Sequence, residues 1–195
     1  MSHQIFHTNA LVLGSRTSGE ANKRITLLTR ELGLVHAMVQ GIRHGKSKLR
    51  FALQDFSLAS VDLVRGREVW RVTSGQPQES FSGLLLQKST KSLFEKVMRL
   101  LGRLYQGEIP NEILFDEIIK FLRFMKETQL PHVEIPLVEV VIITRILHHL
   151  GYLASQDNDH ALLEGPYTTE LFAHVRTIRP RLVQEINQSL QETQL

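Results

Sequence analysis

The first eighty residues alternate between apolar and polar positions with the period of two that is typical of β-strands. In residues 24–30 the alternation places Ile25, Leu27 and Thr29 on one face and polar residues mostly on the other. Glycine-centred turns separate the runs, and the predicted strands cover residues 5–13, 24–30, 34–39, 53–64 and 68–73. Five such strands indicate a small closed β-barrel, because an open sheet of this size would leave edges to protect.

The period changes after residue 78. Apolar residues then recur at intervals of three and four, which predicts amphipathic helices over 78–105, from Asn111 as N-cap to Pro131, over 137–150 and over 168–190. The run 137–150 is apolar almost all round, so we expect it to be the central helix of a bundle. Pro180 predicts a break or kink in the last helix. The fold class is therefore α+β, with a barrel domain at 1–79 and an all-α domain at 80–195.

The charge is distributed unevenly between these two parts. Residues 1–80 hold eleven Lys/Arg against six Asp/Glu, whereas residues 81–195 hold twelve against fourteen. A positive field on one module attracts polyanions such as nucleic acid, and the asymmetry suggests two modules with different roles.

A basic loop at residues 40–50 carries four fixed positive charges and no acid between two strand-like runs. Its cations are Arg43, Lys46, Lys48 and Arg50. Phosphate backbones are a common partner for such a loop, since each phosphate contact releases a condensed counterion. The alternative is a solvated surface turn.

Two further basic segments could line the same groove as the loop. Arg16, Lys23 and Arg24 flank the first connection, and Arg65, Arg67 and Arg71 flank the last hairpin. Three aromatic side chains could stack on bases: Trp70, Phe51 and His44. Trp70 is the preferred candidate, with a core position as its alternative, and Phe51 is expected in the core. We expect binding that is insensitive to sequence and steeply dependent on salt.

A catalytic interpretation has little support. The histidines are scattered, and His148 and His149 with Asp157, Asp159 and His160 form the only group that resembles metal ligands. Adjacent histidines on a helix point about 100° apart, and the acidic run lacks the glycine of a calcium loop. We therefore expect no enzyme activity, no metal and no cofactor.

The cysteine content and the absence of long apolar runs concern the cellular compartment of the protein. The chain of 195 residues contains no cysteine, which excludes disulfides and is compatible with a reducing cytosol. We see neither a secretory signal nor an apolar run long enough to cross a bilayer, and we expect a cytoplasmic, nucleoid-associated protein.

Several short segments, in their order and spacing, resemble the bacterial recombination mediator family RecO. These are Ala10–Arg16, Gly19–Glu20, Leu27–Gly33, Gly41–Arg43 with Lys46–Leu49, Leu53–Phe56 and, less specifically, His148–Tyr152. The resemblance implies an OB-fold joined to a helical domain. It also implies a protein that binds single- and double-stranded DNA, anneals complementary strands, contacts RecR and single-strand-binding protein, and helps to load RecA.

Two positions depart from the family pattern. Gln40 stands where the family usually has a lysine, which leaves Arg43 as the matched cation. Many members carry a four-cysteine zinc site after the segment that resembles Leu150–Tyr152, and this chain has no cysteine, so zinc is not implied. The main alternative function is a protein-interaction adaptor whose DNA affinity is incidental, and a nuclease would be a third.

Overall fold

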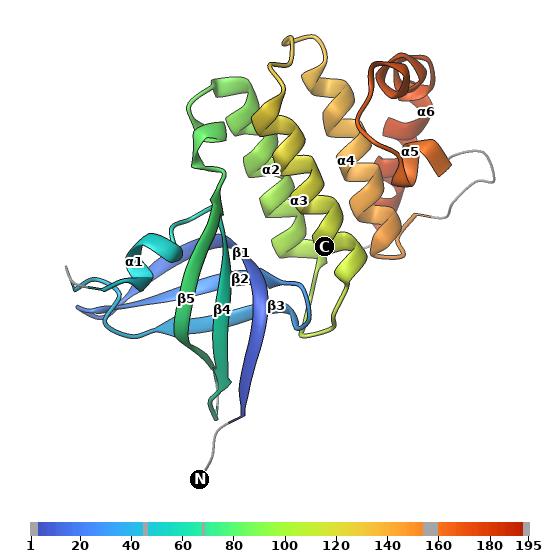
Figure 1. Ribbon diagram of the computed structural model, residues 1–195. Coiled ribbons are helices and arrows are strands. Elements are labelled where there is room, and N and C mark those ends of the chain that lie inside the picture. The colour runs from blue at the N-terminus through green and yellow to red at the C-terminus, as the bar shows by residue number, and fades with distance from the viewer. Residues whose placement is uncertain (1–3, 45–46, 68, 154–159, 193–195) are drawn as a thin grey trace. The chain divides into compact units, whose positions relative to one another are not determined.

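The structure is a computed structural model that describes residues 4–44, 47–67, 69–153 and 160–192 (Figure 1). The chain divides into two compact units, which we call the barrel unit and the helical unit. The barrel unit contains residues 1–83 and 106–115, and the helical unit contains residues 84–105 and 116–195. Residues 106–115 follow a helix of the second half and yet cluster with the barrel.

The barrel is built from five strands. They are β1 (Ile5–Ser18), β2 (Asn22–Thr29), β3 (Gly33–Val39), β4 (Ser57–Arg65) and β5 (Trp70–Ser80). The sheet closes in the order β1-β2-β3-β5-β4, with β3 and β5 parallel and the other pairs antiparallel. A closed five-stranded barrel of this kind is an OB-fold, which confirms the predicted fold class.

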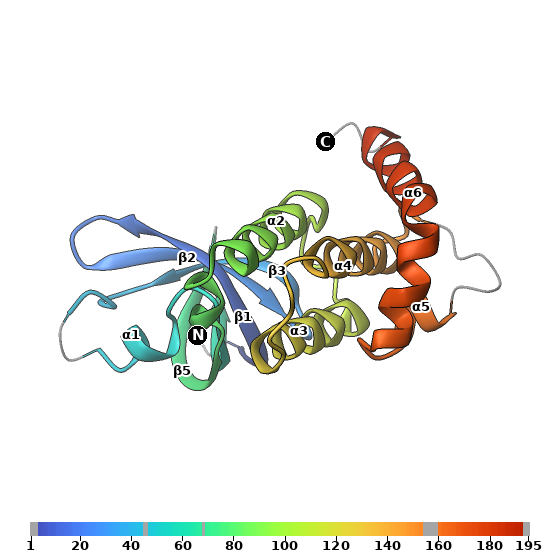
Figure 2. The same ribbon diagram turned by 90° about the horizontal axis from the view of Figure 1, so that it is seen from above.

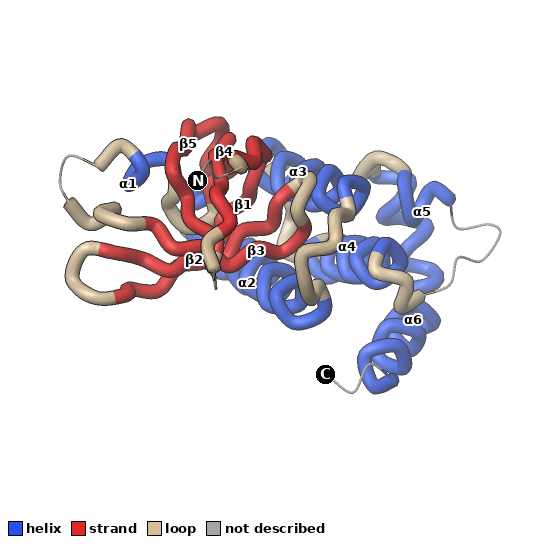
Figure 3. Tube along the Cα trace, turned by 90° about the horizontal axis from the view of Figure 1, so that it is seen from below, coloured by secondary structure: helices blue, strands red, loops and turns tan. Residues whose placement is uncertain are grey.

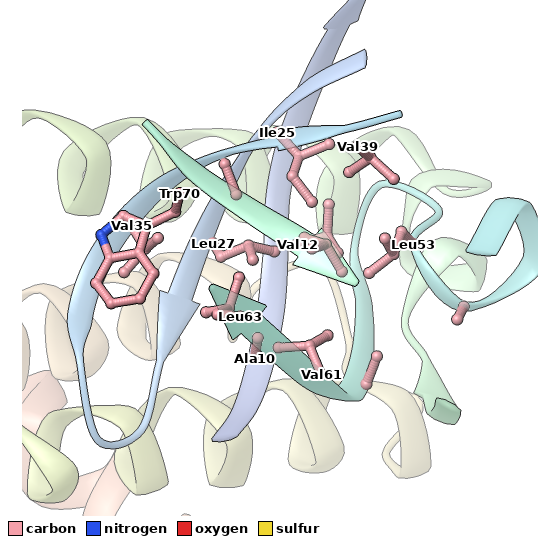
Figure 4. Packing of buried hydrophobic residues seen from close by; sticks show 14 of the residues in the cluster. Ala10, Val12, Ile25, Leu27, Val35, Val39, Leu53, Val61, Leu63 and Trp70 are labelled. Atoms are coloured by element: carbon pink, nitrogen blue, oxygen red, sulfur yellow. The ribbon is translucent and has the colours of Figure 1, made fainter. Parts of the chain in front are cut away.

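The barrel interior is filled by aliphatic side chains from all five strands. In Figure 4, Trp70 and Val35 lie at one end of this cluster, and Leu53 and Val39 lie at the other. Ile25 and Leu27 are fully buried, as the alternation predicted. The period-two pattern therefore identifies the inward face of β2 correctly.

A β-bulge interrupts β1. The pairing with β2 shifts by one residue between Val12, which faces Leu27, and Gly14, which faces Thr26. Leu13 is the extra residue. Before the bulge the even-numbered residues Ala10 and Val12 belong to the barrel core, so without it Arg16 would also point inward. The bulge reverses this alternation and places Arg16 on the outer face.

Two predicted elements differ from the structure around residues 49–57. The expected strand at 53–64 begins only at Ser57, because Phe56 adopts a left-handed backbone conformation with φ of 67°. Before that turn the chain forms a short helix, α1 (Leu49–Ala52), which belongs to the barrel unit (Figure 3). The two ends of the basic loop therefore differ: its last residues are helical.

Three predicted boundaries also move. β1 extends to Ser18, so the expected polar connection after residue 14 is mostly strand. β5 runs to Ser80 and includes Pro77, and a 3₁₀ turn, η1 (Ser82–Leu85), follows. The first long helix, α2 (Lys88–Leu104), consequently begins ten residues later than the apolar pattern predicted.

The helical unit contains α2, most of α3 (Glu112–Glu127), α4 (Ile135–His149), α5 (His160–Glu164) and α6 (Thr169–Glu192). Asn111 is the N-cap of α3, since its Oδ1 accepts a hydrogen bond from the backbone N–H of Leu114 at 2.9 Å. α4 contacts α2, α5 and α6 (Figure 2), and its apolar residues are buried almost all round. The prediction of a central helix is confirmed. Pro180 lies inside α6, which continues through it as one helix.

A buried ion pair joins α3 to α4. The Arg145 side chain is 0% exposed, and its Nη1 donates to Oε1 of Glu117 at 2.7 Å. Its other donors reach the carbonyl oxygens of Leu162 and Gly165, and the Tyr167 hydroxyl donates to the same Glu117 oxygen. Burial raises the pKa of Tyr167 well above its usual value, and the neighbouring Glu117 carboxylate adds to this effect. The guanidinium thereby links Leu162 and Gly165, in and just after α5, to α3 and α4.

Candidate nucleic-acid interface

A transverse row of outward-facing residues crosses four strands of the barrel. Arg24 on β2 is the direct partner of Arg16 on β1 and of Met38 on β3, and Met38 is the partner of Arg71 on β5. We call Arg16, Arg24, Met38 and Arg71 the arginine row. Neighbouring strands lie about 4.8 Å apart, so the row extends over roughly 14 Å.

Alternation along the strands fixes the direction of the row. Ile25, Ala37 and Trp70 each adjoin a row member in sequence, and all three belong to the barrel core. The row therefore faces outward, and its three arginines are exposed. Within the described residues these arginines form no salt bridge, so no acidic side chain in this part of the chain neutralises their charge.

Lys23 does not join the row. It is adjacent to Arg24 and therefore points to the opposite face of β2, where its Nζ donates to Ser15 Oγ at 3.3 Å. Its partner on β3 is Val39, a core residue. Of the two consecutive cations predicted as DNA ligands, only Arg24 lies on the outer face.

The start of the basic loop is held against the β1–β2 turn. Gly41 has a φ of 64°, and its backbone N–H donates to Asn22 Oδ1 at 3.0 Å. Arg43 donates twice to this turn, from its backbone N–H to the Ala21 carbonyl at 3.1 Å and from Nη1 to the Gly19 carbonyl at 3.3 Å. Arg43 is thus fixed near the end of β2 that carries Arg24.

The end of the basic loop is held by α1. Lys48 occupies the N-cap position, Arg50 lies within the helix, and both side chains are exposed. Figures 1 and 2 both place α1 and the β1–β2 turn at the same end of the barrel. Lys46, the remaining predicted cation of the loop, lies outside the described residues.

The β4–β5 turn contributes the last predicted cations. Arg67 is exposed. Arg65 Nη2 lies 3.5 Å from a carboxylate oxygen of Glu108, and its guanidinium carbon lies 5.6 Å from the Trp70 ring centroid. Arg65 is therefore engaged within the barrel unit, and its charge is partly neutralised.

Trp70 is a core residue. This position contradicts its preferred role as a base stacker and agrees with the alternative that the sequence left open. The side chain is 5% exposed and packs edge-on against Phe6, with ring centroids 5.2 Å apart. Its Nε1 donates to Glu108 Oε1 at 2.7 Å. A ring so enclosed offers no face to a base. The reason is alternation: Trp70 is adjacent to the outward Arg71 and must point inward.

Phe51 differs from its expectation in the opposite sense. The sequence predicts a core position for this ring, whereas the structure leaves it 68% exposed on α1. The sequence contained a signal for this position, because Leu49, Ala52 and Leu53 have helical spacing and leave Phe51 on the other side. The strand-like alternation of residues 53–64 overlaps with this helical spacing and masks it.

The described residues show neither a metal site nor a membrane span. They contain no group of three or more His, Asp or Glu side chains placed to hold a metal ion. The candidate ligands Asp157 and Asp159 lie outside the described residues, while His160 pairs with Glu164. No helix in the described part of the chain has the length and apolar character needed to cross a membrane.

The barrel defines the class of protein: an OB-fold with a basic row on its outer surface. Within that class, residues 1–81 match the family model for the N-terminal part of recombination protein O. These residues are therefore similar to the N-terminal domain of the RecO family, and the resemblance seen in the sequence is confirmed.

Curated relatives extend this similarity. The chain is 40% identical over 81 residues to the DNA repair protein RecO of Heliobacterium modesticaldum, a match that covers 42% of this chain and 30% of that protein. It is 30% identical over 148 residues to the RecO protein of Desulfitobacterium hafniense, which covers 76% of this chain and 52% of that protein. It is 32% identical over 122 residues to the Pelotomaculum thermopropionicum RecO protein, covering 63% of this chain and 48% of that protein. The matches thus span about half the length of these relatives, or less.

Proposed function

We propose that this chain binds DNA non-specifically through the outer face of its barrel and acts in DNA repair and recombination. The observation that carries the proposal is the arginine row, in which Arg16 and Arg24 are neighbours and Arg71 lies beyond Met38 on the same face, with no neutralising acid among the described residues. OB-fold proteins bind oligonucleotides along such a face and its adjoining loops. The names of the relatives, DNA repair proteins, support the same role.

The cations have distinct places in the proposed interface. The row contacts the backbone of a strand that crosses the sheet, and Arg43, Lys48 and Arg50 extend the positive surface around the end of the barrel. Arg67 extends it at the β4–β5 turn. Contacts from these cations to the phosphate backbone carry no sequence information, so the binding is insensitive to sequence.

The proposed activity follows from this mode of binding. Backbone contacts leave base edges free to pair, so two bound complementary strands can anneal. As the resemblance implies, the chain would assist RecA loading together with RecR and single-strand-binding protein, in the cytoplasm and at the nucleoid. It would do so as a binding protein without catalysis, metal or cofactor.

The test is fluorescence anisotropy with a labelled single-stranded oligonucleotide at several salt concentrations. The variant carries Arg16→Thr, Arg24→Thr and Arg71→Thr, because threonine is well tolerated on strands. Each lost phosphate contact on a single strand removes about 0.7 from the log–log salt slope, so the slope should flatten by about 2. Strand annealing should slow in parallel.

The matched control removes the same charge elsewhere. Arg99, Arg176 and Arg179 are exposed arginines of α2 and α6, and their triple change to Gln leaves the barrel untouched. This control should bind with unchanged slope. Equal losses in both triple variants would show a diffuse charge effect and contradict the proposed interface, and unchanged binding in the row variant would favour the adaptor function.

A further inference from the structure

Phe51 stands out among the exposed apolar residues of the barrel unit. Its side chain is 68% exposed, although large aromatic rings usually bury most of their surface. It belongs to α1, which connects the basic loop to β4. The ring is thus presented to solvent from a helix that is itself packed on the barrel.

The packing of α1 explains why Phe51 cannot turn inward. Ala52 and Leu53 are core residues, and Leu49 packs against the same core. A Cβ atom at Gly75 of β5 would lie 3.1 Å from Leu49 Cδ2 and 3.6 Å from Ala52 Cβ, so the helix lies close against the strand. Leu49 and Ala52 of α1 and its C-cap residue Leu53 therefore form the inward side of this segment.

Helical geometry then places the remaining side chains. At about 100° per residue, Phe51 points away from Leu49, Ala52 and Leu53. Lys48 and Arg50 fall on either side of it, and both are exposed. Within the described residues neither cation forms a salt bridge. The exposed ring is therefore flanked by two uncompensated positive charges.

We propose that Phe51 is the base-stacking residue of the DNA interface, a step that rests on the proposed function. A nucleobase of a single strand stacks on the Phe51 ring while Lys48 and Arg50 bind the phosphates on either side of that nucleotide. The charge pattern selects this occupant, since a purely apolar partner would gain nothing from two flanking cations. The role expected of Trp70 thus belongs to Phe51, on a different element of the same unit.

Stacking makes a specific demand on the ligand: it needs bases that are accessible. Phe51→Ala should weaken binding of single-stranded DNA by about 5- to 150-fold, which corresponds to the 1–3 kcal/mol found per stacked base. The same change should leave the salt slope intact, because no charge is removed. Binding of an abasic oligonucleotide of equal length, and of blunt duplex DNA, should change less than twofold.

Two additional variants separate stacking from general apolar contact. Phe51→Leu keeps an apolar side chain without a ring and should lose most of the affinity that Phe51→Ala loses. Phe51→Trp should retain binding, and the emission of the new exposed tryptophan should be quenched by single-stranded DNA but not by the abasic strand. Leu86→Ala, at a residue that is 87% exposed in the helical unit, is the control for removing an exposed apolar side chain.

The outcomes distinguish the two proposals. If the intact protein does not bind single-stranded DNA, the proposed function fails and this inference fails with it. If the intact protein binds with the expected salt slope and Phe51→Ala binds equally well, only the stacking role is overturned. Full affinity in Phe51→Leu would also overturn it and would indicate an apolar contact, such as one with a protein partner.

Discussion

Arg16 and Arg24 are direct cross-strand partners on the outer face of the barrel. Like charges placed directly opposite each other destabilise a sheet, and fold stability gives no reason to keep this pair. A bound polyanion would relieve the repulsion. The pair therefore connects the stability of the free barrel to the ligand that we propose for it.

This relationship predicts a trade of stability against binding. Arg24→Thr should raise the free energy of unfolding in urea by up to about 1 kcal/mol at low salt, because it removes the like-charge pair. The gain should shrink in 1 M salt, where the Debye length falls to about 3 Å. Affinity for single-stranded DNA should fall in the same variant. A variant that loses both stability and affinity would contradict the repulsive character of the pair.

The hydrogen bond from Trp70 to Glu108 predicts a second effect. Glu108→Ala leaves the buried indole N–H without its acceptor, which should lower the free energy of unfolding by about 1–3 kcal/mol. Glu108→Gln keeps an acceptor oxygen and should cost less. Trp70 is the only tryptophan, so its fluorescence reports the unfolding of the barrel directly. Equal stability of the Ala and Gln variants would argue against the hydrogen bond.

The ion pair of Arg145 and Glu117 predicts a larger loss in the helical unit. Arg145→Ala leaves the Glu117 carboxylate buried without its partner, and removing one member of a buried pair costs about 3–5 kcal/mol. The double variant Arg145→Met with Glu117→Leu should recover part of this loss, since it removes both charges. Urea unfolding followed by far-ultraviolet circular dichroism measures the change. A double variant less stable than Arg145→Ala would refute the explanation.

His149 predicts a dependence of stability on pH. Burial lowers the pKa of His149 below its ordinary value of 6.5, and the neighbouring His148 lowers it further. The unfolded chain therefore takes up this proton first as the pH falls, so stability is full above about pH 6.5 and decreases below it. His149→Gln should weaken the dependence of the melting temperature on pH between 7 and 5. An unchanged profile would show that other groups dominate in this range.

Local alternation was sufficient to predict much of the fold. The inward residues of β2 and the central helix α4 follow from apolar spacing, the closed five-stranded sheet follows from the need to protect strand edges, and the cap at Asn111 follows from residue type. Three features could not be obtained in this way. The bulge at Leu13 reverses the face of Arg16, and a one-residue change in pairing leaves no mark in the apolar pattern. The left-handed backbone of Phe56 divides the apparent strand at residues 53–64, so that β4 begins only at Ser57.

The third feature concerns the candidate site itself. Trp70 is buried and Phe51 is exposed, the reverse of the preferred prediction, because apolar spacing gives the start of β5 only approximately and does not distinguish the four-residue helix α1 from a loop. The sequence predicts the cations as a set, and their excess over acidic residues in residues 1–80 indicates a polyanionic partner. Their grouping depends on strand register, which joins Arg16, Arg24 and Arg71 and separates Lys23 from them.

The loop between α2 and α3 makes the barrel discontinuous in the chain. The carbonyl oxygen of Gly107 accepts a hydrogen bond from the backbone N–H of Leu34, and Glu108 accepts one from the Trp70 indole. A Cβ atom at Gly33 would lie 2.6 Å from the Ile109 carbonyl oxygen, so the loop lies close against the start of β3. The stretch that matches the family model, residues 1–81, is consequently shorter than the stretch that clusters as the barrel unit. A truncated protein with only those residues would lack residues 106–115, which contact the barrel. The barrel unit therefore depends on residues that lie between two helices of the second half of the chain.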